Sequence, residues 1–359
     1  MQYGVFLPNA TNGYIISTGS PQYRPTFEHN LAITTEAEKQ GLDFVLSMMK
    51  HHGIPGSSDF WGACLESFTL MAALASHTER LTLFPSVTTL ATHPVLAARM
   101  VATIDEISQG RCGLNIVTGW NKPEYESMGL WPGDDYFDRR YSYAAEYVQV
   151  LRKLWSEGNT DFEGEHFTLK DCDVRPKPLH DVQIVCAGQS PKGQRFTAEH
   201  GDRNFIMAER SKVASIASGV KEIGRQVGRD VGTFALYCVI AEETDAEAEK
   251  LCQHILDHAD KEAISRMLGS AELDTNPDGT SAQLLASLAR PADEGNMAFL
   301  SIPVVKGSYE SVARQFDEIA ATTGIDGALL TWPDFVDGVT KFGERVMPLL
   351  TTGARTRAA

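Results

Sequence analysis

The sequence has few basic residues and no long uninterrupted apolar run, and each shortage excludes a class of protein. Its 32 Lys and Arg stand against 47 Asp and Glu, which leaves a formal charge of −15. A nucleic-acid-binding surface needs a basic face that displaces counterions from phosphates, so we expect neither nucleic acid nor an anionic membrane as a partner. No stretch approaches the roughly 20 apolar residues that cross a bilayer, and we expect no secretory signal.

Paired cysteine and histidine motifs are also missing. The six cysteines are spread over the chain without a CxxC pair, and neither an HxH nor an HExxH pattern occurs. A chain of 359 residues can bury a large core without crosslinks, so these cysteines indicate buried thiols of a reducing compartment. The sequence therefore predicts a cytoplasmic protein with neither a disulfide framework nor a metal site.

What the chain does contain is a regular alternation of apolar runs, rich in β-branched residues, with stretches of helical periodicity. The expected strands are Tyr3–Leu7, Asp43–Met48, Leu81–Val87, Cys112–Val117, Gln183–Ala187, Asn204–Met207, Thr233–Ile240, Ala298–Ile302 and Gly327–Thr331. The expected helices are Phe27–Gln40, Leu65–His77, Pro94–Ser108, Asp138–Trp155, Pro191–His200, Val213–Val227, Asp245–Asp257, Ser311–Ala321 and Asp334–Met347. Thr26 and Gly41 predict the two ends of the first helix, and Thr244 with Glu247 predicts a capping box.

Continuous apolar strands that alternate with amphipathic helices indicate a parallel sheet covered by helices. About eight such units favour a single α/β domain over residues 1–359, a (β/α)8 barrel with insertions in its βα loops. The alternative, an open doubly wound sheet that binds a dinucleotide, would need GxGxxG after the first strand, where Pro8-Asn9-Ala10 stands instead. Residues 259–296, with Thr275–Gly279 at their middle, interrupt the repeat and are expected to form an insertion or lid over the site.

In such a barrel the active site lies where strands end and βα loops begin. The loop after the second strand, Met48–Ser58, is long and is followed by Phe60-Trp61, which is typical of a substrate-covering lid. His51 and His52 are adjacent and point apart, so they are solvent-facing residues or substrate contacts rather than metal ligands. Ser86 and Thr88 at the end of the third strand fit either barrel packing or oxygen contacts to a ligand.

Two further strand ends carry polar residues. Asn115 lies among apolar residues of the fourth strand, where a buried amide suits a heterocyclic ligand or, alternatively, a hydrogen bond to a neighbouring strand. Gly188-Gln189-Ser190 leads from the fifth strand into a helix, whose free N–H groups suit a cofactor phosphate, although this pattern is also an ordinary helix cap. Arg139 and Arg140 at another helix start could supply the countercharge or form a solvated face.

Taken together, these motifs resemble those of the bacterial-luciferase-like flavin monooxygenases, which are (β/α)8 barrels. Among them, the chain is most similar to the pyrimidine monooxygenases of uracil degradation. The resemblance covers nearly the whole length. It rests on the runs Gly4–Pro8, Asn12–Thr18, Pro21–Tyr23, Leu65–Met71, Asn115–Arg140, Cys186–Ser190 and Phe342–Arg345.

The resemblance implies a set of residues that bind FMN. These residues are Met49, Lys50, Asn115, Glu124, Arg140, Tyr141 and Ser190. Ser190 and Arg140 would hold the phosphate, Asn115 the edge of the flavin ring, and Glu124 or Tyr141 the ribityl or ring-edge polar groups. Leu46, Met48 and Ser86, together with Asn115, are expected to form the catalytic pocket that receives O2.

The resemblance further implies a two-component reaction and its partners. A separate NAD(P)H flavin reductase would supply reduced FMN. With O2, the enzyme would open the ring of uracil or thymine at an amide carbonyl, giving a ureidoacrylate-type product. A homo-oligomer, dimer or tetramer, is expected.

The sequence departs from the pattern expected of the pyrimidine monooxygenases at three places. His51-His52 stands where an apolar and then a basic residue are expected, Ser86 where threonine is expected, and Asn121 where glutamine is expected. The substrate alternatives are therefore another amide heterocycle or a sulfone. A deazaflavin-dependent dehydrogenase of the same superfamily, a hydrolase and a non-catalytic flavin-binding protein are the alternative functions.

Overall fold

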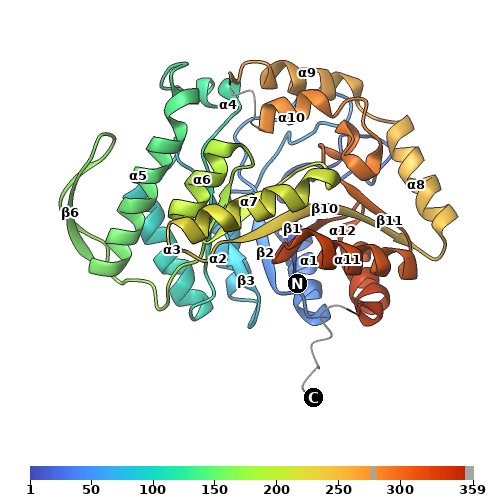
Figure 1. Cartoon of the computed structure of the whole chain (residues 1–359), viewed down its shortest axis with the longest axis horizontal. Coiled ribbons are helices and arrows are strands. Elements are labelled where there is room, and N and C mark those ends of the chain that lie inside the picture. Colours follow the sequence, from blue (N-terminus) through green and yellow to red (C-terminus); the bar gives the residue numbers. More distant parts are fainter. Residues whose placement is uncertain (276–279, 352–359) are drawn as a thin grey trace.

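Parallel strands form a closed ring in the computed structural model, which describes residues 1–275 and 280–351 (Figure 1). The strands follow one another around the ring as β1 (Gln2–Leu7), β2 (Phe44–Ser47), β3 (Thr82–Phe84) with β4 (Ser86–Thr88), β5 (Leu114–Val117), β8 (Ile184–Ala187), β9 (Arg203–Ile206), β10 (Gly232–Glu242) and β12 (Gly327–Thr331). Because β3 and β4 are two parts of one strand interrupted at Pro85, the ring has eight strands. The expected (β/α)8 barrel is confirmed.

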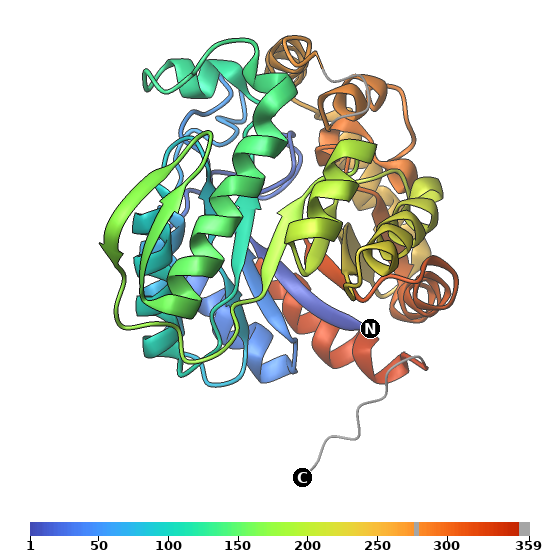
Figure 2. The ribbon, with the colours of Figure 1, turned by 60° about the vertical axis from the view of Figure 1, so that its left-hand side comes forward.

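Helices cover the outside of the ring (Figure 2). They are α1 (Phe27–Gln40), α2 (Ser67–Ala75), α3 (Pro94–Ser108), α4 (Lys122–Glu126), α5 (Tyr136–Glu157), α6 (Pro191–His200), α7 (Val213–Gln226), α8 (Asp245–Asp257), α9 (Lys261–Ala271), α10 (Thr280–Ala286), α11 (Tyr309–Thr323) and α12 (Phe335–Lys341). The predicted ends of α1 are confirmed, because Thr26 accepts from the His29 N–H and Gly41 takes a left-handed φ of 80°. The predicted capping box of Thr244 and Glu247 at the start of α8 is also confirmed.

Aromatic side chains fill one end of the barrel interior. Phe44 of β2 stacks on Phe234 of β10 with ring centroids 4.6 Å apart, and Phe84 of β3 meets Phe44 edge-on at 5.8 Å. Gly4 and Gly113 give these rings room, since a Cβ at either position would lie inside a ring's van der Waals envelope. Because these three rings close the end at which β2, β3 and β10 begin, open space remains toward the carboxyl ends of the strands.

The segment before the last strand differs from the prediction. Residues 298–302, expected as a strand, contain the short 3-10 turn Met297–Phe299 and then Leu300 and Ser301 with left-handed φ values of 52° and 61°. The strand in this region is β11 (Val304–Ser308), which pairs with β10 outside the ring. The tight turn is fixed by backbone bonds that fold the chain back, such as Ser301 N–H to the Asn296 carbonyl at 3.0 Å.

A hairpin that the sequence did not predict follows α5. Its strands are β6 (Asn159–Glu163) and β7 (Thr168–Asp173), which project at the side of the barrel (Figure 1). The Glu146 carboxylate on α5 accepts hydrogen bonds from the backbone N–H groups of Glu165, His166 and Phe167, so this one side chain fixes the hairpin tip to the helix.

The segment 259–296 contains α9 and α10, which lie on the same side of the barrel as α4 (Figure 1). Asp260 begins α9 by accepting from the Ala263 N–H, and its carboxylate also accepts from the Ser58 N–H and hydroxyl at 2.7 Å. Residues 276–279 at the centre of the expected insertion lie outside the described residues. In the described part of the chain, no helix is long and apolar enough to span a membrane.

Candidate active site

A cavity of about 910 Å³, including its mouth, opens among the strand ends and the loops that follow them. Its walls are mostly aromatic and aliphatic, with a few polar groups. The lining residues are Phe6, Tyr14, Met48, Met49, Lys50, Trp61, Ser86, Asn115, Val117, Trp120, Ala187, Gly188, Gln189, Phe205, Met207, Leu236, Leu284 and Leu300. An enclosed apolar space with few polar groups at the carboxyl ends of barrel strands is the usual form of a ligand site.

Asn115 on β5 supplies the most informative polar atom of this cavity. The residue is 3 % exposed, and its Nδ2 donates to Ser86 Oγ at 2.8 Å. Its Oδ1 has no hydrogen-bond partner among the described residues. A buried acceptor without a partner is costly, so this atom indicates where a ligand donor belongs. Asn115 therefore makes the predicted hydrogen bond to a neighbouring strand and also lines this cavity.

The end of β2 contributes Met48 and Met49 to the cavity wall. Asn9, which is fully buried, accepts from the Met48 N–H and donates to the Met48 carbonyl, both at 2.9 Å. The Asn9 side-chain amide thus bonds both backbone groups of Met48, the residue that follows the end of β2. Leu46, expected in the same pocket, is buried on the same side of β2 as Met48, but it is not among the residues that line the cavity.

Lys50 and Glu124 form a buried ion pair at the cavity wall. The two side chains are 8 % and 4 % exposed, and the ammonium group lies 4.9 Å from the centre of the Trp61 ring and 5.7 Å from that of Trp120. Glu124 also accepts the backbone N–H of His51 at 2.6 Å. The carboxylate therefore fixes both the lysine and the start of the loop that follows it, while two aromatic faces favour the cation.

His51 lies at the rim rather than in the cavity wall. Its Nε2 is 3.3 Å from Thr88 Oγ1, and partial burial lowers the pKa of the imidazole from its ordinary value. His52 is exposed. Among residues 1–275 and 280–351, no group of three or more His, Cys, Asp or Glu side chains is arranged to hold a metal ion.

The start of α6 forms the opposite end of the site. Ser190 is 2 % exposed and accepts from the Gly193 N–H at 3.2 Å, and Tyr141 of α5 places its hydroxyl 3.5 Å from Ser190 Oγ. A Cβ on Gly188 would lie 2.8 Å from the Gly193 Cα, so only glycine permits this close passage of two backbone segments. Tyr141 and Ser190, far apart in the sequence, are thus brought together at a helix N-terminus that favours an anion.

Arg140 is held beside this end by an acid from the inserted segment. Its Nη1 lies 2.9 Å from Oδ2 of Asp274, and its guanidinium lies 5.4 Å from the centre of the Tyr141 ring. Its Nε is buried and has no hydrogen-bond partner among the described residues. The helix therefore presents a buried cation at the predicted phosphate end, already paired with a carboxylate.

The other cations expected near the site are also paired. Lys122 of α4 contacts Asp134 at 2.7 Å, and Arg139 of α5 contacts Asp135 at 2.7 Å; the two aspartates are exposed residues of the loop before α5. Each of these two cations is therefore matched by a carboxylate, and neither lines the cavity.

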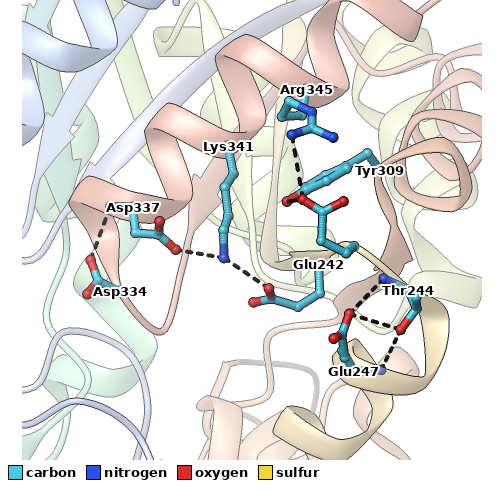
Figure 3. A network of polar contacts seen from close by, with 9 residues as sticks. Glu242, Thr244, Glu247, Tyr309, Asp334, Asp337, Lys341 and Arg345 are labelled. Carbon is cyan, nitrogen blue, oxygen red and sulfur yellow. Dashed lines mark hydrogen bonds and ion pairs between the residues drawn. The ribbon is translucent and has the colours of Figure 1, made fainter.

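A second hollow lies between β10, α8 and α12, away from this cavity. Lys341 bridges Glu242 at 2.9 Å and Asp337 at 2.8 Å, and Arg345 approaches Glu243 at 3.5 Å (Figure 3). These charges neutralise one another within the protein, so the hollow has the character of a structural network rather than of a ligand site.

Several lining residues were not predicted from the sequence as site residues. Phe6, Tyr14, Phe205, Met207, Leu236, Leu284 and Leu300 are examples. Some of them could in principle be found from the sequence, because Phe6, Phe205 and Leu236 belong to apolar strands and alternate residues of a barrel strand face the interior. Leu284 and Leu300 come from the segment before β11, whose path no local pattern indicates.

The sequence matches the family model described as luciferase-like monooxygenase over residues 1–327. It is 46 % identical to the pyrimidine monooxygenase RutA of Escherichia coli O81 (strain ED1a) over 362 aligned positions, which cover all of this chain and 94 % of the relative. It is 47 % identical to the protein of the same name from Escherichia coli strain ATCC 8739 over 98 % of this chain and 96 % of the relative.

Solved structures share the fold at low sequence identity. A riboflavin lyase (RcaE) superposes with a TM-score of 0.84 at 21 % identity, covering 97 % of this chain and 91 % of the other. The EDTA monooxygenase (EmoA) from Chelativorans sp. BNC1 superposes with a TM-score of 0.80 at 18 % identity, covering 97 % and 93 %. Because the family model covers most of the chain and the sequence relatives cover all of it, this protein belongs to the luciferase-like monooxygenase family.

Proposed function

We propose that the protein is an FMN-dependent monooxygenase that uses reduced FMN and O2 to open the ring of a pyrimidine, uracil or thymine, at an amide carbonyl. The product is of the ureidoacrylate type. The relatives named pyrimidine monooxygenase, 46 % and 47 % identical over 94 % and 96 % of their own length, support this substrate class. The single observation that carries the proposal is a cavity with an unpartnered Asn115 acceptor in its wall and an anion-favouring helix start at its edge.

The residues present fit FMN. A planar aromatic ring suits walls of Trp61, Trp120 and Phe205, and the unpartnered Asn115 Oδ1 suits a polar ring edge. At the other end, the Gly188 passage and the buried Nε of Arg140 suit a phosphate.

The division of roles among the cofactor residues follows from this grouping. Ser190, Tyr141 and Arg140 would hold the phosphate end, because Tyr141 lies at Ser190 rather than beside Glu124. Asn115 would accept from the ring. Met49 and Lys50 would cover the ring from the loop after β2, with Glu124 fixing the lysine.

Bound reduced FMN would supply the electrons that activate O2, while the chain positions the reactants and excludes water. Met48, Ser86 and Asn115 lie together in the wall, and we propose that they form the oxygen pocket, with Leu46 packed behind it. The apolar wall of Leu236, Leu284 and Leu300 would receive the pyrimidine. These aliphatic side chains would keep water from the reacting carbonyl.

We propose that the described parts of the segment 259–296, residues 259–275 and 280–296, cover this site. Leu284 reaches the cavity wall, Asp274 pairs with Arg140, and Asp260 bonds to Ser58 of the loop after β2. The segment therefore contacts both the expected ring-covering loop and the expected phosphate end.

Reduced FMN would come from a separate NAD(P)H flavin reductase, since the sequence has no GxGxxG fingerprint of its own for a nicotinamide dinucleotide. We also propose that the protein works in the cytoplasm as a homo-oligomer, a dimer or tetramer. Size-exclusion chromatography with light scattering tests the oligomeric state, and a monomer would contradict it.

Oxygen uptake with reduced FMN tests the reaction. We expect uptake above that of free reduced flavin when uracil or thymine is added, with a product heavier than the substrate by one oxygen atom, taken from O2, and two hydrogen atoms. A panel of other amide heterocycles and a sulfone tests the substrate alternatives. Turnover without oxygen would instead indicate the deazaflavin-dependent dehydrogenase, and unaltered uptake with every compound would indicate a flavin-binding protein without this activity.

The variant Asn115→Ala tests the site. We expect product formation to be lost while FMN binding weakens but stays measurable, because the ring loses one hydrogen bond and the phosphate end is intact. Asn159→Ala on the exposed hairpin is the matched control and should turn over normally. Unaltered turnover of Asn115→Ala would contradict the assigned role.

A further inference from the structure

The backbone ladder between β2 and the strand that contains β3 and β4 is interrupted beside the cavity. Thr82 donates its N–H to the Asp43 carbonyl at 3.1 Å, and the same register continued by four residues would bring the Ser86 N–H to the Ser47 carbonyl. That bond is not formed. The Ser86 N–H donates instead to Ser67 Oγ at 2.7 Å. The Ser47 carbonyl accepts a hydrogen bond from the Ser86 hydroxyl rather than from the Ser86 N–H.

This exchange determines how the Asn115 amide is turned. A carbonyl only accepts, so the single hydroxyl proton of Ser86 is committed to Ser47. Ser86 Oγ can then only accept from Asn115, whose Nδ2 lies 2.8 Å away. The amide must therefore direct its NH2 group to Ser86 and offer its carbonyl oxygen to the cavity. The hydrogen-bond network fixes this assignment even though an amide's nitrogen and oxygen have nearly the same shape.

Ser67, the first residue of α2, maintains the exchange from outside the barrel wall. It is fully buried, it accepts the Ser86 N–H, and its Oγ lies 2.5 Å from Ser47 Oγ. Neither Ser47 nor Ser67 lines the cavity. Their hydroxyl groups act on the ligand site only through Ser86 and Asn115.

We infer that Ser67 and Ser86 are positioning residues that commit Asn115 to accept a hydrogen bond, so that the site selects the redox form of flavin that has an N–H group at N5. This inference rests on the proposed function. Both redox forms of flavin carry an N–H at N3, but only reduced flavin carries one at N5. We place N5 at Asn115, because this residue lies with Ser86 in the pocket proposed to receive O2. An acceptor fixed at N5 therefore favours the reduced form that the reaction consumes, because oxidised flavin has only a lone pair at N5 and leaves the buried acceptor unpaired.

Removal of the Ser67 hydroxyl has a specific expected consequence. In Ser67→Ala the Ser86 N–H loses its acceptor and can close the regular ladder on the Ser47 carbonyl. The Ser86 hydroxyl is then free to donate to Asn115 Oδ1, and the amide turns to offer NH2 to the cavity. Ser86→Ala removes the same constraint directly, whereas Ser86→Thr retains the hydroxyl.

Dissociation constants for reduced FMN, measured anaerobically, and for oxidised FMN test the inference by titration of flavin fluorescence and absorbance. In Ser67→Ala and Ser86→Ala we expect the preference for reduced over oxidised FMN to fall about three- to ten-fold, the value of one hydrogen bond. Ser86→Thr should keep the native preference. Ser108→Ala, which removes a buried hydroxyl at the far end of α3, is the control and should also keep it.

Equal weakening for both forms of FMN, or an unaltered preference, would overturn the inference. A rise in KM for the pyrimidine with the flavin preference unaltered would place the substrate, not the flavin, at Asn115 and would overturn it as well. If Ser67→Ala does not fold in a thermal unfolding assay, the comparison of Ser86→Ala with Ser86→Thr decides. Native protein that binds neither form of FMN would refute the proposed function itself, whereas native preference retained in the variants would refute only the positioning role.

Discussion

Arg140 and Asp274 form an ion pair that is 4 % and 0 % exposed and joins α5 to the segment proposed to cover the cavity. The two residues are 134 positions apart in the chain. A pair this deeply buried gains little net stability from its attraction, because both charges have lost their hydration, yet removal of one partner leaves the other uncompensated. The phosphate end of the site and its proposed cover are therefore energetically linked.

The variant Asp274→Asn should make FMN a stronger stabiliser of the fold. Without the carboxylate, Arg140 is a buried cation that a phosphate can neutralise, so we expect a lower Tm in the free protein and a larger rise of Tm on addition of FMN than in the native protein. Riboflavin, which lacks the phosphate, should not give the larger rise. An equal FMN-induced rise in both proteins would show that Asp274 and the phosphate do not share Arg140.

The variant Arg140→Ala should separate FMN from riboflavin. Loss of a charged hydrogen bond to the phosphate is expected to weaken FMN binding about ten-fold or more, with little change for riboflavin. Arg139→Ala is the matched control, because the Arg139 side chain is next in the sequence, is more exposed than that of Arg140, and pairs with Asp135. Equal losses of affinity for both flavins would argue against the phosphate assignment.

The variant Glu124→Gln should destabilise the protein markedly. Lys50 would remain as an uncompensated cation between Trp61 and Trp120, and we expect the free energy of unfolding to fall by roughly 3–5 kcal/mol in urea denaturation. The double variant Lys50→Met with Glu124→Gln should recover most of that loss while binding FMN poorly. A loss below about 1 kcal/mol in the single variant would mean that the pair is effectively solvated.

Stability should fall as the pH is lowered through the histidine range. Burial lowers the pKa of His29, His51 and His200 in the folded protein from the ordinary value of 6.5. Below about pH 6.5 these histidines are protonated more readily in the unfolded chain than in the folded one. The free energy of unfolding is therefore highest above that pH and falls as the pH is lowered below it. Urea denaturation between pH 5 and 8 measures this slope. His51→Gln should reduce the slope, and a native protein equally stable at pH 5.5 and 7.5 would contradict the prediction.

The sequence predicted the parts of the fold that local physics determines. Thr26, Gly41 and the pair Thr244 and Glu247 mark helix ends through bonds to residues three or four positions away, and these helices begin and end where expected. Residues 298–302 show the limit of such patterns. Their apolar composition fits a strand, but long-range bonds such as the Ile16 N–H to the Ala298 carbonyl at 2.7 Å hold them in a turn.

The same distinction applies to the site. Strand-end position indicated Asn115, and the helix start indicated Ser190, because both depend on nearby residues. The partners of these residues could not be predicted, since Asp274 reaches Arg140, and Ser67 reaches Ser86, only after the barrel has closed. The resemblance supplied Glu124, whose bond to Lys50 explains physically why an acid lies beside a proposed flavin contact.

The matched charges around the mouth also determine how a ligand would arrive. Lys50, Lys122, Arg139 and Arg140 are each paired with a carboxylate, so these four cations add no net positive charge to a protein of net charge −15. A doubly charged phosphate ester that diffuses toward it therefore meets long-range repulsion and no electrostatic steering. Added salt screens that repulsion, so flavin capture should become faster as ionic strength rises, the reverse of what a basic entrance would give.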